Sequence, residues 1–415
     1  MIKVKENLLE EIVNFYMKSH DFNGFPAISL DANDESVQVI IDLIQERKIE
    51  LHRGDRHPNP HIKAFVVEDK AEQIRKIKGN GIEGCLYPTA EYLRDTVAQD
   101  NDKPFTSMLI RGEPQLSFKA FDLSILEIYR NDPKYTYKTD DICGSISVND
   151  KHYNSIEMED RDKVFLQTFG YCYNNNMTRA VAVFLRYLSD LSPEHQRVWY
   201  TKLLDRDFKL HPDYYKTSII GDFPERVSIF DAFLEEQNQI NNMSKKIGKP
   251  PFFKNNYKAY ERPRHFGFLI RPTRKEYHDF IHLLDKLLSD NINRDFFKGD
   301  VKLNEKAIKE SGEEVILSRP TIILLEEWLQ RVIFPDSKPK DEMLQIFRKI
   351  RSLRAPIAHK LDDDHFDQQF FHDQRELITE AYKAIRTMRL ILANHPRLKK
   401  FEIPDWLYKG EIWTY

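Results

Sequence analysis

Arg354 and His359 are five residues apart in the stretch FRKIRSLRAPIAHKLDDD, which covers residues 347–364. An imidazole titrates near neutral pH, so it can take up or release a proton during a reaction. A guanidinium stays charged and binds phosphate oxygens through two parallel hydrogen bonds. Together these side chains could transfer a proton beside a phosphate group without a metal ion. The alternative is that they cap helix ends and bind backbone carbonyls.

The spacing of this pair does not by itself select it. Five other arginine–histidine pairs have similar spacings: Arg47/His52, Arg56/His61, Arg206/His211, Arg271/His278 and Arg389/His395. Arg206/His211 is the nearest rival, because the polar Asp207 follows the arginine. What separates Arg354 and His359 from the others is their predicted position in the fold.

The region 275–395 has the clearest helical pattern in the chain. Apolar residues recur at helical spacing in four segments, 277–288, 322–332, 343–353 and 377–392. Four amphipathic helices in about 120 residues predict an antiparallel bundle. Arg354 then lies at the end of the third helix, and His359 lies on the connection to the fourth.

In this setting the segment R-x-x-R-x-P-x-A-H-K, residues 351–360, resembles the HEPN domains of bacterial defence and toxin proteins. These are four-helix ribonucleases whose signature is R-x4–6-H. The resemblance covers the last 120–140 residues or so. Many members of the family have a polar residue directly after the arginine, whereas this chain has Ala355.

The resemblance implies a metal-independent endoribonuclease without a cofactor, whose two motifs meet across a homodimer and leave cyclic phosphate ends on RNA. It implies that His359 is the acid/base group and Arg354 binds phosphate, with Arg351 and Lys360 in support. It also implies a toxin or antiviral effector, with a regulatory protein or antitoxin as a possible partner. The alternative, favoured by Ala355, is a non-catalytic bundle for dimerisation or partner binding, with a DNA-binding N-terminal unit.

The composition is that of an ordinary globular protein. Of the 415 residues, 41% are hydrophobic and 31% charged, which excludes a largely disordered chain. The 63 basic and 66 acidic side chains leave a formal net charge of −3, so any binding to nucleic acid needs a local patch. Three widely spaced cysteines and the absence of a long apolar segment predict a cytoplasmic protein that does not enter a membrane.

One local patch is the predicted connector 245–274. Residues 245–275 hold ten basic side chains and one acid, Glu261. The candidates for RNA binding are Lys254, Lys258, Arg262, Arg264 and Arg271. Interleaved aromatic residues could stack on bases, or they could be core residues beneath a solvated basic face: Phe252, Phe253, Tyr257, Tyr260, Phe266 and Phe268.

The predicted fold class is mainly α. Residues 1–77 suggest a winged-helix-like α+β unit, because two helical patterns precede two strand-like runs, 48–51 and 61–67. Residues 78–244 are expected to form a mostly helical middle domain. The aromatic tail 396–415 is expected to dock on a folded surface.

Two further motifs are weak. Gly79-x-Gly81-x-x-Gly84 follows a charged helical pattern rather than a strand, so it predicts a turn and not a nucleotide site. His278 and His282 are four apart and could share a metal ion, but no third ligand is evident. The sequence therefore predicts no metal site.

Overall fold

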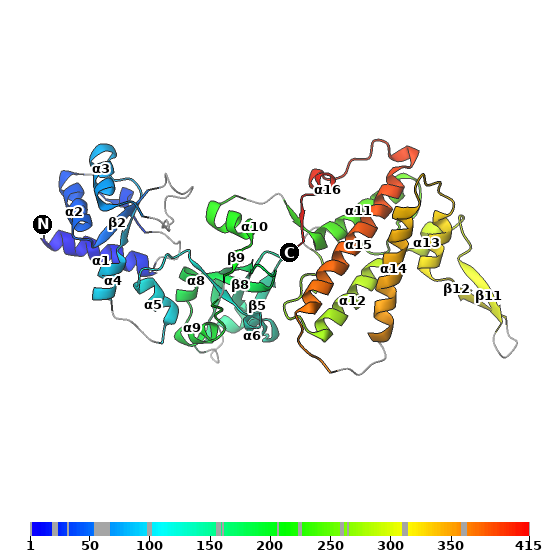
Figure 1. Ribbon diagram of the computed structural model, residues 1–415, viewed down its shortest axis with the longest axis horizontal. Coiled ribbons are helices and arrows are strands. Elements are labelled where there is room, and N and C mark those ends of the chain that lie inside the picture. The colour runs from blue at the N-terminus through cyan, green and yellow to red at the C-terminus, as the bar shows by residue number, and fades with distance from the viewer. Residues whose placement is uncertain are drawn as a thin grey trace. The chain divides into compact units, whose positions relative to one another are not determined.

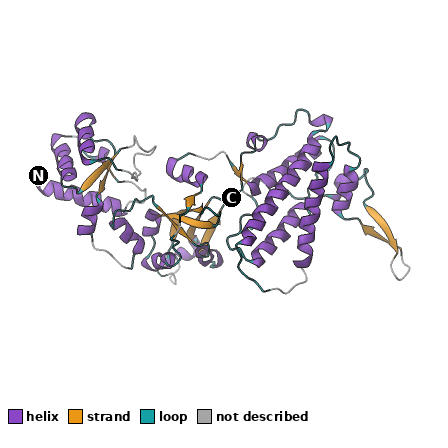
Figure 2. Ribbon diagram, in the orientation of Figure 1, coloured by secondary structure: helices purple, strands orange, loops and turns teal. Residues whose placement is uncertain are grey.

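The computed structural model describes residues 2–18, 24–30, 33–53, 67–97, 102–154, 159, 162–205, 207–222, 226–257, 261–263, 265–308, 314–357 and 363–414. The chain divides into two compact units, Met1–Pro224 and Glu225–Tyr415. About 52% of the protein is helical and several small sheets are present (Figure 2), so the fold is mixed α+β with substantial helix.

The first part of unit 1 is a small three-stranded sheet covered by helices. The antiparallel order is β1-β3-β2. Its elements are α1 (Ile2–Lys18), β1 (Phe25–Pro26), α2 (Asp34–Gln45), β2 (Ile49–His52), α3 (Lys70–Asn80) and β3 (Cys85–Pro88). The side chain of Asn33 caps α2 by accepting a hydrogen bond from the Ser36 N–H. Apolar residues of α1, α2 and β2 then form one core.

This topology differs from the hairpin suggested by the sequence. The strand predicted at 48–51 is present as β2, but its partner is β3, which follows α3. The second predicted strand, 61–67, lies outside the described residues except for Val67, which is not in a strand. The first part of unit 1 also extends beyond residue 77, where the sequence predicted its end. α3 continues to Asn80, and β3 (Cys85–Pro88) belongs to the same sheet as β2.

The remainder of unit 1 is built on a six-stranded antiparallel sheet. Its order is β4-β8-β7-β6-β5, with β9 paired to β7. The strands are β4 (Phe118–Phe121), β5 (Tyr135–Thr139), β6 (Cys143–Val148), β7 (Phe165–Tyr173), β8 (Arg179–Phe184) and β9 (Lys209–Leu210). The helices are α4 (Ala90–Thr96), α5 (Pro104–Ile110), α6 (Ile125–Asn131), α7 (Asp150–Tyr153), α8 (Leu185–Ser189), α9 (Pro193–Tyr200) and α10 (Pro212–Tyr215).

The sheet corrects the expectation of a mostly helical middle domain. Every residue of β8 is buried, so both of its faces are covered and its sequence shows no polar alternation. A short apolar run of this kind cannot be distinguished from a buried helix by periodicity. α9 begins with a capped first turn, in which Ser192 accepts a hydrogen bond from the His195 N–H and Pro193 occupies the first helical position.

Unit 2 contains a four-helix bundle (Figure 1). α15 packs against α11, α12 and α14, and α12 packs against α14. The bounds are α11 (Ile229–Lys246), α12 (Arg274–Leu288), α14 (Lys338–Ile357) and α15 (Gln369–Ala393). Three of the four predicted helices therefore belong to the bundle.

The remaining bundle helix is α11, which the sequence placed in the middle region. The predicted segment 322–332 forms α13 (Thr321–Leu329), which packs beside α14 and the short η5 helix (Arg294–Phe297). α11 completes the bundle because its buried side is long, including Phe230, Phe233 and Ile240. The packed bundle thus begins about 45 residues before the boundary predicted at Lys275.

Two smaller features complete unit 2. Between α12 and α14 the chain forms a hairpin of β11 (Asn304–Ile308) and β12 (Glu314–Ser318). The tail forms η6 (Pro396–Leu398), α16 (Asp405–Lys409) and β13 (Ile412–Trp413), which pairs in parallel with β10 (Val227–Ser228). Trp413 is buried and stacks on Phe268.

A buried ion pair joins α11 and α15. The Arg389 guanidinium donates two hydrogen bonds to the Glu236 carboxylate, one of them Nη2 to Oε1 at 3.2 Å. Glu236 is fully buried and Arg389 nearly so. Burial raises the pKa of Glu236, while hydrogen bonds from Arg389 oppose that rise. Arg389, a member of a rival arginine–histidine pair, is thus a structural residue.

Replacing Arg389 by leucine leaves the Glu236 carboxylate buried without its counter-ion, and should destabilise unit 2 by about 3–5 kcal/mol. The pKa of Glu236 rises further in this variant. A carboxyl whose pKa is higher in the folded than in the unfolded state loses stability as the pH rises between the two values. The loss should therefore be greater at about pH 7 than at about pH 5, measured by urea denaturation.

The control is the double variant Glu236→Leu with Arg389→Leu, which removes both charges and should recover most of the stability. Leu390→Ala, at an exposed position beside Arg389, should change the free energy of unfolding by less than about 0.5 kcal/mol. Equal instability of the single and double leucine variants would contradict this account.

Candidate functional site

Arg351 and Arg354 lie in the last two turns of α14. They are three residues apart, so they share one face of the helix. That face is turned toward α12, with which α14 is packed. α12 ends at Leu288, and Asp285 lies in its last turn while Asp290 lies in the connection that follows.

Both guanidinium groups bind the same two carboxylates. Oδ2 of Asp285 lies 2.8 Å from Nη1 of Arg351 and 2.7 Å from Nη1 of Arg354. Asp290 accepts hydrogen bonds from the same two nitrogens, from Nη1 of Arg351 at Oδ1 (2.5 Å) and from Nη1 of Arg354 at Oδ2 (2.6 Å). We call these four residues the Arg–Asp cluster. Two positive and two negative charges make it neutral overall.

The cluster spans the boundary between core and solvent. The Asp285 side chain has no exposed area, whereas those of Arg354 and Arg351 are 29% and 45% exposed. In the described part of the chain, the hydrogen bonds of both arginine side chains use only Nη1. The bonds to Asp285 and Asp290 thus leave the Nε–Nη2 edge of each guanidinium out, and two N–H groups along one edge suit a phosphate.

Titration within the cluster follows from these contacts. Burial raises the pKa of Asp290, but hydrogen bonds from Arg351 and Arg354 outweigh it and hold that pKa below its usual value. The hydrogen bonds that Arg351 and Arg354 donate to Asp290 and Asp285 raise the pKa of both arginines. Both arginines thus stay charged across the physiological range.

His282 lies one turn before Asp285 on α12. Burial lowers its pKa below the usual value, and the positive charges of Lys286 and Arg354 lower it further. These effects favour the neutral form of the imidazole. His278, one turn earlier on α12, was the other half of the weak metal motif. Over the described ranges, no group of three histidine, cysteine or acidic side chains could hold a metal ion.

The second half of the motif lies outside the described residues. α14 ends at Ile357, and His359 and Lys360 fall within 358–362, which the structure does not describe. The structure places Arg354 in the last turn of α14, five residues before His359. It thus supports the predicted position of Arg354 and leaves that of His359 a prediction.

The basic candidates of the connector are dispersed. Lys254 is closest to the cluster, because its Nζ donates to the backbone carbonyl of Asp290 at 2.7 Å. Arg262 is paired with Asp231 at 3.2 Å, and Arg271 is exposed with its backbone N–H bonded to Glu276. Lys258 and Arg264 lie outside the described residues.

Four phenylalanines of this connector are core residues. Phe252, Phe253 and Phe266 have no exposed area, and Phe268 is 6% exposed. Phe266 and Phe268 pack edge-on against Phe230 of α11. These rings cannot stack on bases. For these four residues the second alternative from the sequence holds, that they are core residues.

Asp285 and Asp290 were missed by sequence reasoning. The signal for Asp285 is its place between Leu284 and Leu287, on the apolar side of α12. An ionised side chain on a buried helix face requires a partner of opposite charge. No comparable signal marks Asp290, since acidic residues are common after a helix.

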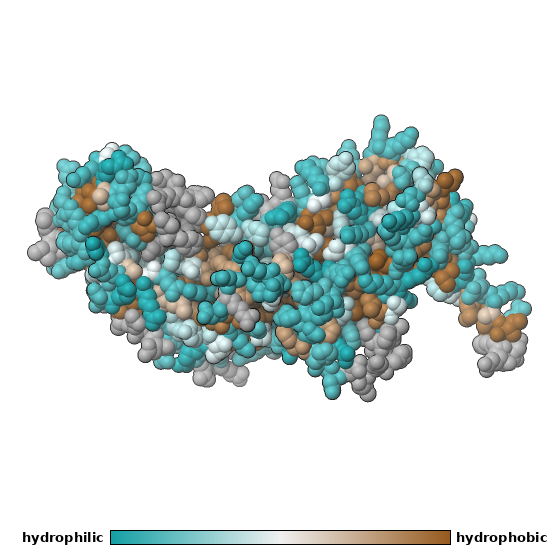
Figure 3. All heavy atoms as spheres, in the orientation of Figure 1, coloured by the Kyte–Doolittle hydropathy of each residue, from teal (hydrophilic) through white to brown (hydrophobic). Residues whose placement is uncertain are grey.

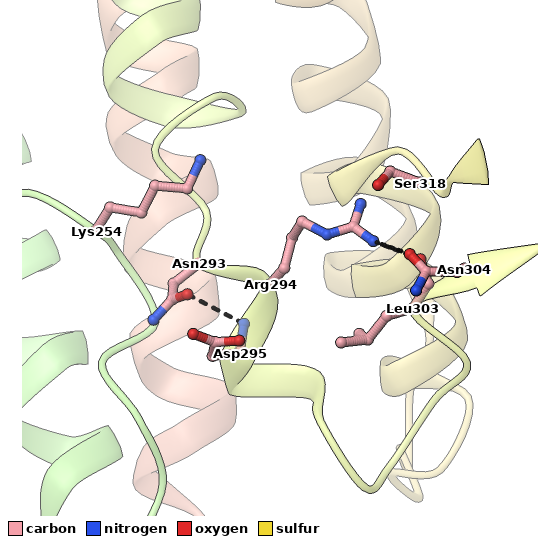
Figure 4. A pocket seen from close by; sticks show the side chains of 7 residues that line it. All are labelled: Lys254, Asn293, Arg294, Asp295, Leu303, Asn304 and Ser318. Atoms are coloured by element: carbon pink, nitrogen blue, oxygen red, sulfur yellow. Dashed lines mark hydrogen bonds between the residues drawn. The ribbon is translucent and has the colours of Figure 1, made fainter. Parts of the chain in front are cut away.

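A shallow hollow of about 400 Å³ lies at the base of the hairpin β11–β12 (Figure 4). It is lined by Lys254, Asn293, Arg294, Asp295, Leu303, Asn304 and Ser318. The Arg294 guanidinium donates to the side chain of Asn304 and to the carbonyls of Leu303 and Arg319. Arg294 thus holds the hairpin in place, and Lys254 connects the hollow with Asp290.

The rival motifs have structural roles where they are described. His211 is fully buried and caps α10, and His52 is 4% exposed beside Glu50. Arg53, directly after β2, donates to the Gly81 carbonyl at 2.7 Å and has a side chain only 9% exposed. Arg47 is exposed.

Comparison with models of known families, with curated proteins and with solved structures finds no significant match. Among the described helices, each is too short or too polar to cross a bilayer.

Replacing Arg354 by glutamine should raise the pKa of His282. The change removes a positive charge near the imidazole and releases Asp285 and Asp290 from one counter-ion, and both effects favour the protonated ring. A titration of the histidine ring protons by NMR measures this pKa.

The control is Arg348→Gln, one turn from Arg351 on α14, where the arginine pairs with Glu326 at 2.5 Å. That variant should leave the pKa of His282 unchanged. An equal shift in both variants, or a fall in the Arg354→Gln protein, would show that His282 does not sense the cluster.

Proposed function

We propose that unit 2 is a metal-independent endoribonuclease of the HEPN type. The observation that carries the proposal is the pair Arg351 and Arg354 at the end of a bundle helix, both held by Asp285 through Nη1. Preorganised donors of this kind bind the phosphate and stabilise the charge that develops on it. His359 follows five residues later on the chain.

The residues have distinct roles in the proposed reaction. His359 accepts the proton of a ribose 2′-hydroxyl, whose oxygen attacks the adjacent phosphorus. The bond to the 5′-oxygen breaks, that oxygen takes up a proton, and a 2′,3′-cyclic phosphate remains. Arg354 binds the phosphate oxygens with help from Arg351 and Lys360. Asp285 is a positioning residue, because it holds both guanidinium groups without facing solvent.

The wider proposal concerns the whole chain. Two copies combine their motifs into one composite site, and the protein acts in the cytoplasm as a toxin or antiviral effector. The three cysteines are free thiols, which agrees with a reducing compartment. Unit 1 senses a trigger or binds a regulatory protein.

A second candidate function is a non-catalytic module for dimerisation or partner binding. The specific observation in its favour is the neutrality of the Arg–Asp cluster. Asp285 and Asp290 cancel the charge of both arginines, and a buried carboxylate needs such compensation whether or not a substrate binds. In this function Arg354 only ties α14 to α12.

Cleavage of a mixed-sequence single-stranded RNA in the presence of EDTA distinguishes the two functions. The wild type should cut RNA and leave cyclic phosphate ends. His359→Ala should lower the rate by about 10²-fold or more, because general acid–base catalysis contributes roughly that much. Arg354→Ala should also lower the rate.

The matched controls are His365→Ala and Arg348→Ala. His365 is exposed six residues after His359, and Arg348 is exposed on α14, so neither belongs to the proposed site. Both should cut RNA as the wild type does. Equal cleavage by wild type and His359→Ala, or no cleavage by the wild type, would leave the second candidate function.

A further inference from the structure

The segment between α12 and α14 exposes an unusual share of apolar side chains. Among the described residues of unit 2, eight large hydrophobic side chains are exposed, and five of them come from positions 308–333: Ile308, Ile316, Leu317, Ile323 and Ile333. Three of the five belong to the hairpin of β11 and β12. Figure 3 shows hydrophobic atoms on this hairpin, which extends away from the bundle helices in Figure 1.

The hairpin arm, residues 304–308 and 314–318, is too small to be stable by itself. Each strand has five residues, and an isolated two-stranded hairpin is at best marginally stable in water. The register pairs Lys306 with Ile316, so Ile308 and Ile316 lie on the same face. They are 73% and 74% exposed, which means that the described residues of the chain do not cover them.

The two edges of the arm differ in their protection. β11 carries Glu305 and Lys306, and a charged edge, lysine above all, discourages pairing with another strand. β12 has the sequence EVILS, with neither a basic residue nor a proline. Among the described strands, neither edge has a third strand beside it. β12 is therefore the edge that is open to a partner strand.

A second copy of the same strand is complementary to β12. Two antiparallel copies related by a twofold axis through Ile316 place Ile316 opposite Ile316 of the partner subunit. Val315 then lies opposite a leucine, and Glu314 lies opposite a serine. Apolar side chains meet apolar ones and no like charges face each other. The same operation on β11, about its central residue, would place two lysines opposite each other.

We propose that the hairpin arm is a dimerisation element, in which β12 of two copies pairs antiparallel about Ile316 to form the four-stranded sheet β11-β12-β12-β11. Such an interface is isologous and closed, as twofold contacts are. The strand pairing covers less than the roughly 800 Å² per partner of a standard interface. The dimer should therefore be reversible and depend on concentration.

The first experiment measures the mass of the full chain by sedimentation over a range of micromolar concentrations. The wild type should shift from monomer to dimer as the concentration rises. Ile316→Asp should stay monomeric, because it places two carboxylates opposite each other at the axis. Ile308→Lys is the control, with a charge introduced at nearly equal exposure on the other strand. It faces Glu314 within the hairpin and should dimerise as the wild type does.

The second experiment tests the register by cross-linking. Ile316→Cys should form an intermolecular disulfide under mild oxidation, because directly opposite residues have Cβ atoms about 5 Å apart. Ile308→Cys and the wild type, with its native thiols, should not. A wild type that is monomeric throughout, equal weakening of the dimer by Ile316→Asp and Ile308→Lys, or cross-linking of Ile308→Cys but not of Ile316→Cys would overturn the proposal. A monomeric wild type would also contradict the composite nuclease site proposed above, whereas the comparisons between variants at Ile316 and at Ile308 test the arm alone.

Discussion

The Asp285 carboxylate has no exposed area and must be paired with positive charge. This requirement fixes how α14 packs against α12 at one end of the bundle. An ionised carboxylate removed from water costs several kcal/mol unless it is paired and hydrogen-bonded. Arg351 and Arg354 supply that pairing from α14, and Asp290 holds the same two groups from the solvent side. The last turns of α14 are therefore fixed in rotation against the end of α12.

The same cluster sets the balance between the two candidate functions. An arginine already held by a carboxylate keeps its orientation when a substrate arrives, so little conformational entropy is lost on binding. Its net attraction for phosphate is weaker, because the carboxylates oppose it. In a nuclease the carboxylates would fix the orientation of the arginines but weaken their attraction for phosphate. A dimerisation module needs only the link that the cluster makes between α12 and α14.

How well the sequence predicted each element depended on how local its signal was. α12, α14 and α15 were predicted correctly because each shows apolar residues at helical spacing on one face. β8 was missed because a strand covered on both faces loses the alternation that identifies a strand. α11 was assigned to the wrong region, since its role depends on packing with α15, more than a hundred residues later in the chain.

At the site, the sequence alone determined the residue types and the position of Arg354 near the end of an amphipathic helix, because both are local properties. The sequence also places four phenylalanines beside the basic residues of the connector, but it does not decide whether they face the core or solvent. Only the tertiary structure paired Arg351 and Arg354 with Asp285 and Asp290, some sixty to seventy residues earlier. Such ion pairs depend on how each helix is rotated about its axis and shifted along its neighbour in the packed bundle. The spacing of residues along one helix does not contain that information.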